Sequence, residues 1–216
     1  MTERPTLRRR ARAGFTLIEL LVVILIIGIL STFLLPRIPE AIEASKVAGS
    51  SRNLTEIYRG LATEYPAKFD RRLPNESGVK FFACLIYKGV WENVPSSAKK
   101  LTCPGVDIGA LTIGDLPEEE WFSDPDVIDG SYSSYAGRDC DQFPLRNTSG
   151  KDCWVATDND GGMNFRTTTL MLMGDGAVER LETYTLIEEG VLDEGEEILF
   201  VGPDSQHEEL RKLSLD

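Results

Sequence analysis

The stretch Gly14–Leu30 reads GFTLIELLVVILIIGIL, and it decides how the first part of this chain folds. Apart from one carboxylate, Glu19, it consists of Leu, Ile, Val, Phe, Thr and Gly. A carboxylate at the centre of a membrane helix costs about 2.5–3.5 kcal/mol on insertion scales, so such groups are rare and usually have a partner. The alternative to a partner is that Glu19, which lies near one end of the run, leans toward the lipid interface, where its cost is small.

The flanks of this run differ sharply in charge. Residues 1–14 hold five arginines against Glu3, a net charge of +4, which leaves 18 basic and 34 acidic residues, or −16, for the rest of the chain. Residues 15–35 carry Glu19 as their only charge and would span about 31 Å as a helix, enough for one bilayer crossing. The positive-inside rule then predicts a cytoplasmic N-terminus and an acidic body across the membrane.

Two simpler interpretations of the run are a removable secretory signal and an uncleaved anchor. Secretory signals have apolar cores of about 7–15 residues and an Ala-x-Ala-like site. Here the core is longer, and TFLLPRIPEAIEASK follows it without such a site. The sequence therefore disfavours an ordinary cleaved signal.

The segment RRRARAGFTLIELLVVILIIGIL resembles the N-terminal signature of the type IV pilin and type II secretion pseudopilin superfamily. The resemblance rests on Gly14, Phe15, Thr16, Leu17 and Glu19. It implies that a prepilin peptidase cuts between Gly14 and Phe15 and N-methylates Phe15, so that residues 1–14 are a leader and the span is kept. It also implies a proline-kinked helix, with the kink at Pro36.

Cleavage would give Glu19 a partner. A new α-amino group on Phe15 would lie at a helix N-terminus, which already carries a partial positive charge, and Glu19 lies one turn further on. The carboxylate can neutralise that amine or the amine of a neighbouring subunit. The resemblance favours the neighbour, which makes Glu19 an assembly residue.

Residues 36–65 continue the helical period as the soluble half of a spine helix. One apolar stripe recurs at steps of mostly three and four residues; its members are Ile38, Ile42, Val47, Leu54, Ile57, Tyr58, Leu61 and Tyr65. Pro36 and Pro39 should kink this helix, and Pro66 should end it. A coiled-coil seam is the alternative, but the heptad is irregular.

Residues 66–216 read as a small head, which predicts an α+β fold with a long N-terminal helix packed against an antiparallel sheet. Residues 81–94 suggest a helix ended by Gly89, and residues 131–137 a strand. In residues 166–186 two alternating runs flank Gly174-Asp175-Gly176, the pattern of a tight hairpin. The acidic runs 117–121 and 188–197 read as solvated faces.

Two features of the head are similar to one large subgroup of pilin-like proteins. A Leu-x-Cys-Pro segment is matched by Leu101, Cys103 and Pro104. A C-terminal box from Met-Asn to Asp-Gly is matched by residues 163–164 and 175–176. The box's usual His residues are absent, and Ala177 follows the Asp-Gly pair.

The four cysteines lie on the outer side of the predicted span. An even number of cysteines in an oxidising compartment suggests bridges, and four allow three pairings. Short loops close most readily, which favours Cys140–Cys153 and Cys84–Cys103. Free thiols are the alternative.

Residues 158–162 read Asp-Asn-Asp-Gly-Gly and resemble part of a calcium loop, with Asp158 and Asp160 as candidate ligands. The distal glutamate and a third spaced ligand are out of register, so an Asx/Gly turn is the preferred interpretation. With one histidine and no Cys-x-x-Cys, a zinc site is not expected, and no cofactor is predicted.

Motifs and charge indicate which other classes of function are not expected. No catalytic motif is present, so an enzyme is not expected. The acidic composition argues against nucleic acid as a partner. The expected function is a structural subunit of a type II secretion pseudopilus or type IV pilus-like filament. Its partners would be other pilin-like subunits, the prepilin peptidase and an inner-membrane assembly platform. A minor or tip pilin, or a membrane-retained protein whose head binds a ligand, is the alternative.

Overall fold

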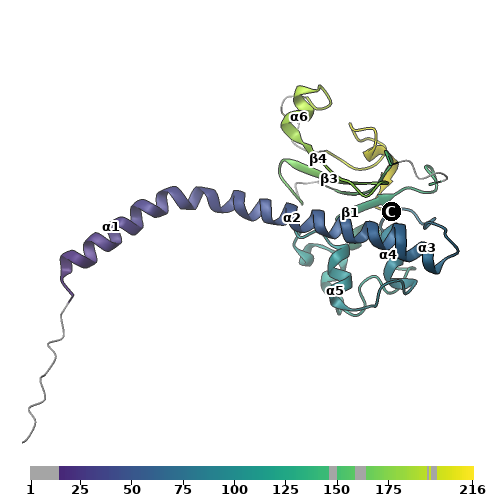
Figure 1. Ribbon diagram of the computed structural model, residues 1–216, viewed down its shortest axis with the longest axis horizontal. Coiled ribbons are helices and arrows are strands. Elements are labelled where there is room, and N and C mark those ends of the chain that lie inside the picture. Colours follow the sequence, from purple (N-terminus) through teal and green to yellow (C-terminus); the bar gives the residue numbers. More distant parts are fainter. Residues whose placement is uncertain (1–14, 146–149, 159–163, 194, 196–198) are drawn as a thin grey trace, which may run out of the picture. The chain divides into compact units, whose positions relative to one another are not determined.

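The structure is a computed structural model of the 216-residue chain, and it describes residues 15–145, 150–158, 164–193, 195 and 199–216 (Figure 1). The chain divides into two compact units, residues 1–42 and residues 43–216.

The first unit is helical from Leu17 onward. Helix α1 (Leu17–Leu34) is followed by a single 3-10 turn, η1 (Leu35–Arg37), and by the first residues of α2 (Ile38–Arg59). The 3-10 turn contains Pro36, the residue at which the sequence predicts a kink. No residue of α1 is buried.

The second unit begins with the spine of the head, which comprises α2 from residue 43, a π-helical turn, η2 (Gly60–Glu64), and α3 (Tyr65–Lys68). Five members of the predicted stripe are buried at helical spacing: Val47, Leu54, Ile57, Leu61 and Tyr65. Ser50 and Gly60, which the stripe did not include, are buried as well, whereas Ile38 and Ile42 are exposed. The prediction that Pro66 ends the helix is wrong by about half a turn. Pro66 lies at the start of α3, where its missing N–H is tolerated.

Gly60 lets the spine lie close to the next helix. A Cβ at Gly60 would come within 2.8 Å of Leu85 and 2.9 Å of Trp91. Leu85 belongs to α4 (Val79–Tyr87), whose predicted end is confirmed by Gly89 at φ 67° shortly after it.

The short helix α5 (Pro95–Ala98) follows. Four 3-10 turns come next along the chain, namely η3 (Lys99–Leu101), η4 (Ile108–Ala110), η5 (Thr112–Asp115) and η6 (Gly130–Tyr132).

The sheet has five strands in the order β4-β3-β2-β1-β5, and every pair is antiparallel. The strands are β1 (Tyr135–Arg138), β2 (Cys153–Thr157), β3 (Thr168–Met173), β4 (Val178–Glu182) and β5 (Leu213–Ser214). The predicted hairpin is confirmed, because Leu172 pairs with Val178 and Gly176 takes φ 88° in the turn. The predicted strand at residues 131–137 begins later, since residues 130–132 form η6.

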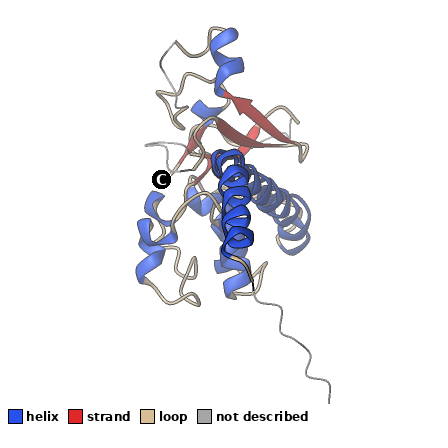
Figure 2. Ribbon diagram, turned by 90° about the vertical axis from the view of Figure 1, so that its left-hand side faces the viewer, coloured by secondary structure: helices blue, strands red, loops and turns tan. Residues whose placement is uncertain are grey.

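Strands β1, β2 and β3 are buried throughout, whereas β4 at one edge of the sheet is partly exposed. Figure 2 shows helices and loops on both sides of the sheet. One face packs against the spine and α4, through side chains such as Leu54, Phe81 and Trp154. The other face is covered by Leu186 of α6 (Thr183–Glu188) and by later apolar residues, Leu192, Leu199 and Leu210. Leu210 opens the 3-10 turn η8 (Leu210–Lys212). The predicted α+β layout is confirmed, whereas this second layer was not foreseen.

Candidate functional site

Helix α1 begins with a capping box that is formed by Thr16 and Glu19. Thr16 is the N-cap, with extended backbone at φ −87° and ψ 149°. Its backbone N and its hydroxyl each donate to Glu19 Oε2 at 2.8 Å, and Glu19 N donates back to Thr16 Oγ1 at 3.3 Å. Such reciprocal bonds satisfy backbone donors that a helix start otherwise leaves free. The helix therefore begins at Leu17, and Phe15 and Thr16 stay outside it.

Glu19 is positioned to receive a second donor. Both of its bonds to Thr16 use Oε2, and no described residue donates to Oε1. The carboxylate also lies in the first turn of α1, where the helix dipole favours a negative charge. An amine placed near the start of α1 would thus meet a carboxylate that is already oriented and has one oxygen available.

Phe15 is the first described residue and directly precedes the cap, with its side chain 75% exposed. Gly14, the other residue of the predicted cleavage pair, lies outside the described residues. The described side of the predicted scissile bond is therefore non-helical, with the helix starting two residues further on.

The remaining surface of α1 is apolar. Within the described residues, one continuous helix, Leu17–Lys68, is long and apolar enough to cross a membrane, and none of its most apolar 18-residue stretch is buried. Thr32 satisfies its hydroxyl by donating to Ile29 O at 2.6 Å, as polar groups in lipid must. One side of α1 forms a shallow groove lined by Leu21, Ile24, Leu25, Gly28, Ile29 and Thr32.

Comparison with known families assigns this region. Residues 9–35 match the model of the prokaryotic N-terminal methylation motif, which covers the second half of the basic flank, the predicted cleavage pair and α1. This chain carries a prepilin-type methylation motif. Together with the long apolar helix, the match supports a type IV pilin or pseudopilin, a structural rather than catalytic family. Searches of curated proteins and of solved structures each found no match.

Sequence reasoning missed the role of Thr16 in this pilin-like protein. The signal was present, because Thr-x-x-Glu directly before an apolar run is the pattern of a capping box. The resemblance implies a role for Glu19 toward the amine created by cleavage and none for the Thr16 hydroxyl three residues before it.

The favoured disulfides are absent, which corrects that prediction. All four cysteines are buried free thiols. Cys84 lies on α4 and donates to Phe81 O, whereas Cys103 bonds Ser50 Oγ at 3.0 Å. Cys140 belongs to the core beside the spine, and Cys153 to the layer on the other face of the sheet. Short separation in sequence did not predict pairing, because the sheet separates the residues of the 140–153 pair.

Of the predicted calcium loop, residues 158–162, the structure describes Asp158 alone. Asp160 lies outside the described residues. Asp158 is buried at the end of β2, where its N donates to Ser134 O and its carbonyl accepts from Asn164 Nδ2. The described part of the chain contains no cluster of three His, Cys, Asp or Glu residues suited to a metal ion.

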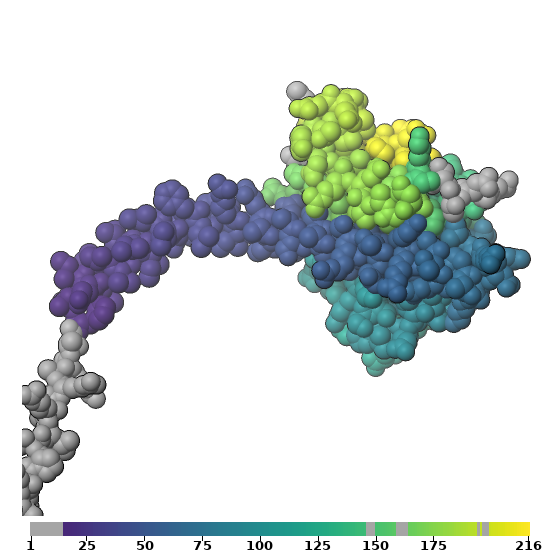
Figure 3. All heavy atoms as spheres, viewed as in Figure 1, coloured from purple at the N-terminus to yellow at the C-terminus, as the bar shows by residue number. Residues whose placement is uncertain are grey.

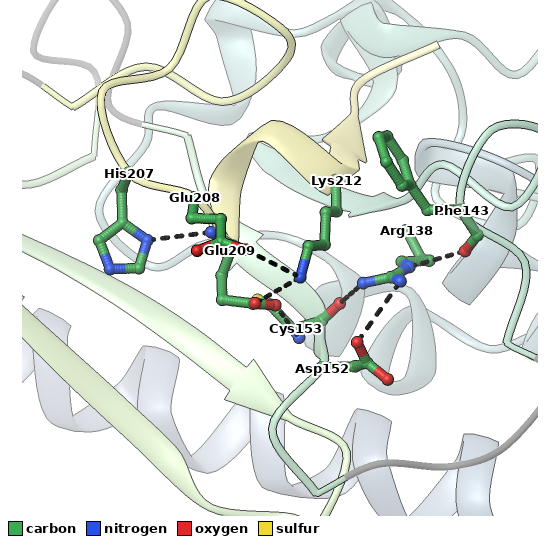
Figure 4. A network of polar contacts seen from close by, with 8 residues as sticks. All are labelled: Arg138, Phe143, Asp152, Cys153, His207, Glu208, Glu209 and Lys212. Carbon is green, nitrogen blue, oxygen red and sulfur yellow. Dashed lines mark hydrogen bonds and ion pairs between the residues drawn. The ribbon is translucent and has the colours of Figure 1, made fainter.

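A polar network fastens the segment after α6 to the sheet (Figure 4). The carboxylate of Glu209 accepts from Cys153 N at 3.0 Å and from Lys212 Nζ at 2.5 Å. Arg138, almost fully buried, donates to Phe143 O and Cys153 O and pairs with Asp152 at 3.6 Å. Glu209 thus joins the last segment to β2, and Arg138 joins β1 to β2 and to the loop at Phe143, so the network holds these parts of the head together.

Proposed function

We propose that this protein is a structural subunit of a pilus-type or pseudopilus-type filament. A prepilin peptidase cuts between Gly14 and Phe15 and methylates Phe15, leaving 202 residues (216 − 14) that begin at the head of their own membrane helix. The observation that carries the proposal is the methylation motif over residues 9–35, continuous with an unburied apolar helix capped by its only carboxylate.

Assembly would depend on two properties of α1, its apolar surface and the carboxylate of Glu19. Its apolar surface leaves the bilayer only when other apolar helices replace the lipid, so the helices of neighbouring subunits bundle in the filament. The free Oε1 of Glu19 takes the methylated amine of a neighbour and sets the axial register between subunits. The acidic head then lies on the outer side of the inner membrane and on the filament surface.

The partners follow from this route. They are other pilin-like subunits, the prepilin peptidase and an inner-membrane assembly platform. The protein begins as a single-pass inner-membrane protein with a cytoplasmic N-terminus, in keeping with the arginines of residues 1–14.

Mass spectrometry of the N-terminal peptide from the native protein tests the proposal. We expect N-methylated Phe15 in the wild type and retention of residues 1–14 in Gly14→Ala. Gly28→Ala is the matched control, since a Cβ there meets nothing within 4 Å and should leave processing unchanged. A mature N-terminus at any other residue, or wild-type protein absent from sheared filaments, would contradict the proposal.

A further inference from the structure

The spine of the head leaves one face uncovered. Six exposed residues at steps of three and four form this outer stripe: Ser45, Ala48, Arg52, Thr55, Arg59 and Thr63. The stripe lies opposite the buried residues of the same helix, such as Leu54 and Leu61. Figure 3 shows this segment of the spine open at the surface between the sheet-bearing part of the head and the part formed by residues near 100.

The outer stripe is basic, although the chain after residue 14 carries a net charge of −16. Its only charged members are Arg52 and Arg59, seven residues apart and therefore about 10.5 Å apart along one helix face. Arg52 makes no ion pair with a described residue. Arg59 pairs with Glu64 at 3.2 Å while its side chain stays 68% exposed. The other members are small, so another surface can approach the backbone closely.

An acidic loop of the same head offers the complementary charge. Residues 115–126 contain six carboxylates and no basic residue: Asp115, Glu118, Glu119, Glu120, Asp124 and Asp126. Glu118 pairs with Lys99 at 2.8 Å. The other five make no ion pair with a described residue, so their charge is uncompensated within the part of the chain that the structure describes.

This acidic loop is held in one shape. Trp121 and Phe122 are buried at its centre, and Trp121 Nε1 donates to Leu116 O at 3.1 Å. Phe122 takes φ 55°, an uncommon value for a bulky residue, and its ring lies 6.2 Å from that of Tyr132. Asn93 Nδ2 donates to Glu119 O at 2.7 Å. A loop fixed in this way loses little entropy when it binds.

We propose that the outer stripe of one subunit binds the acidic loop of a second copy. Arginine suits this contact, because its planar guanidinium pairs with carboxylates through two parallel hydrogen bonds. The two surfaces are different parts of one chain, so the contact is heterologous, and such contacts repeat into an open helical filament when the rotation between copies does not close a ring. The inference rests on the proposed function and names the contact between heads that would accompany the packing of α1.

Charge reversal between two differently tagged full-length copies tests the contact. The stripe variant carries Arg52→Glu and Arg59→Glu, and the loop variant carries Glu119→Lys and Glu120→Lys. Copies are co-expressed, extracted in detergent at low salt, and co-purified through one tag. The control for the stripe variant, Arg166→Glu with Arg180→Glu, makes the same change in net charge at exposed residues that do not belong to the stripe.

We expect each reversal variant to co-purify with itself roughly fivefold less than wild type, the scale of two or more exposed ion pairs lost. The stripe variant mixed with the loop variant should recover most of the wild-type yield, and the control should match wild type. This contact alone is overturned if the reversal variants co-purify with themselves as well as wild type does. It is also overturned if the mixture of the two variants co-purifies no better than either variant alone. A wild-type chain that does not self-associate would contradict the proposed function as well.

Discussion

Thr16 and Glu19 cap the start of α1 reciprocally, with two bonds of 2.8 Å to one carboxylate oxygen and one of 3.3 Å returning to the hydroxyl. Replacing Thr16 by Val removes both side-chain bonds, and we expect a loss of about 1 kcal/mol in the local stability of the first turn. Amide hydrogen exchange in micelles should then be faster at residues 17–20. Thr16→Ser keeps the hydroxyl and should exchange like wild type. If residues 17–20 of the Val variant exchange at the wild-type rate, the cap does not stabilise the first turn.

Glu19→Ala should separate insertion from assembly. Removing the carboxylate lowers the cost of placing α1 in lipid, so the membrane-bound amount should be unchanged or higher. Filament yield after shearing should fall at least tenfold, because the neighbour's amine loses its counter-charge. Glu19→Gln is the matched control for shape. A wild-type yield of filaments from the Ala variant would show that assembly does not require the carboxylate of Glu19.

Ser50 ties the spine to the sheet through a buried hydroxyl pair. Its Oγ lies 2.7 Å from Tyr135 OH and 3.0 Å from Cys103 Sγ. Burial raises the pKa of Tyr135 well above its usual value, so the phenol stays neutral and needs a partner. Ser50→Ala should lower the free energy of unfolding by about 1–3 kcal/mol in urea melts followed by tryptophan fluorescence. Thr55→Val, on the exposed face of the same helix, should change it by less than about 0.5 kcal/mol.

The thiols should be present but unreactive in the folded head. Burial raises the pKa of all four, that of Cys140 to about 12, so almost no thiolate forms near pH 8. A thiol reagent should modify the native protein slowly and modify four thiols per chain in denaturant without reductant. Fewer than four in denaturant would show that a disulfide forms.

His207 should titrate below its ordinary range. Burial lowers its pKa against the opposing pull of Glu209, Glu179, Glu208 and Glu189, and its Nδ1 accepts from Glu209 N at 3.3 Å in the neutral form. Because the unfolded chain takes up the proton more readily, this residue's contribution to stability is full above about pH 6.5 and falls with pH below that.

The chain has one histidine, so a single NMR resonance reports the titration of His207. Its midpoint should lie lower in the folded protein than in urea. Between pH 7 and pH 5, the free energy of unfolding should decline less in the variant His207→Gln than in the wild type. A folded midpoint at or above the unfolded one would contradict the prediction.

Periodicity predicted the elements that depend on local pattern. The spine's buried stripe and the hairpin at Gly176 were confirmed, because a step of three or four residues and a two-residue alternation each fix one buried face. Ser50 was missed because the stripe was traced through apolar residues, and its burial depends on Tyr135 from a strand 85 residues away. The second layer over the sheet was missed because Leu186, Leu192 and Leu199 are scattered among acidic residues.

By itself, the sequence determined the N-terminal part of this protein. A capped apolar helix with a basic flank needs no distant partner to form, since its hydrogen bonds are all local and its surface is suited to lipid. Only the tertiary structure decided the head. There the pairing of β5 with β1, the separation of Cys140 from Cys153 by the sheet, and the display of Arg52 and Arg59 on an uncovered face depend on contacts between segments far apart in the chain.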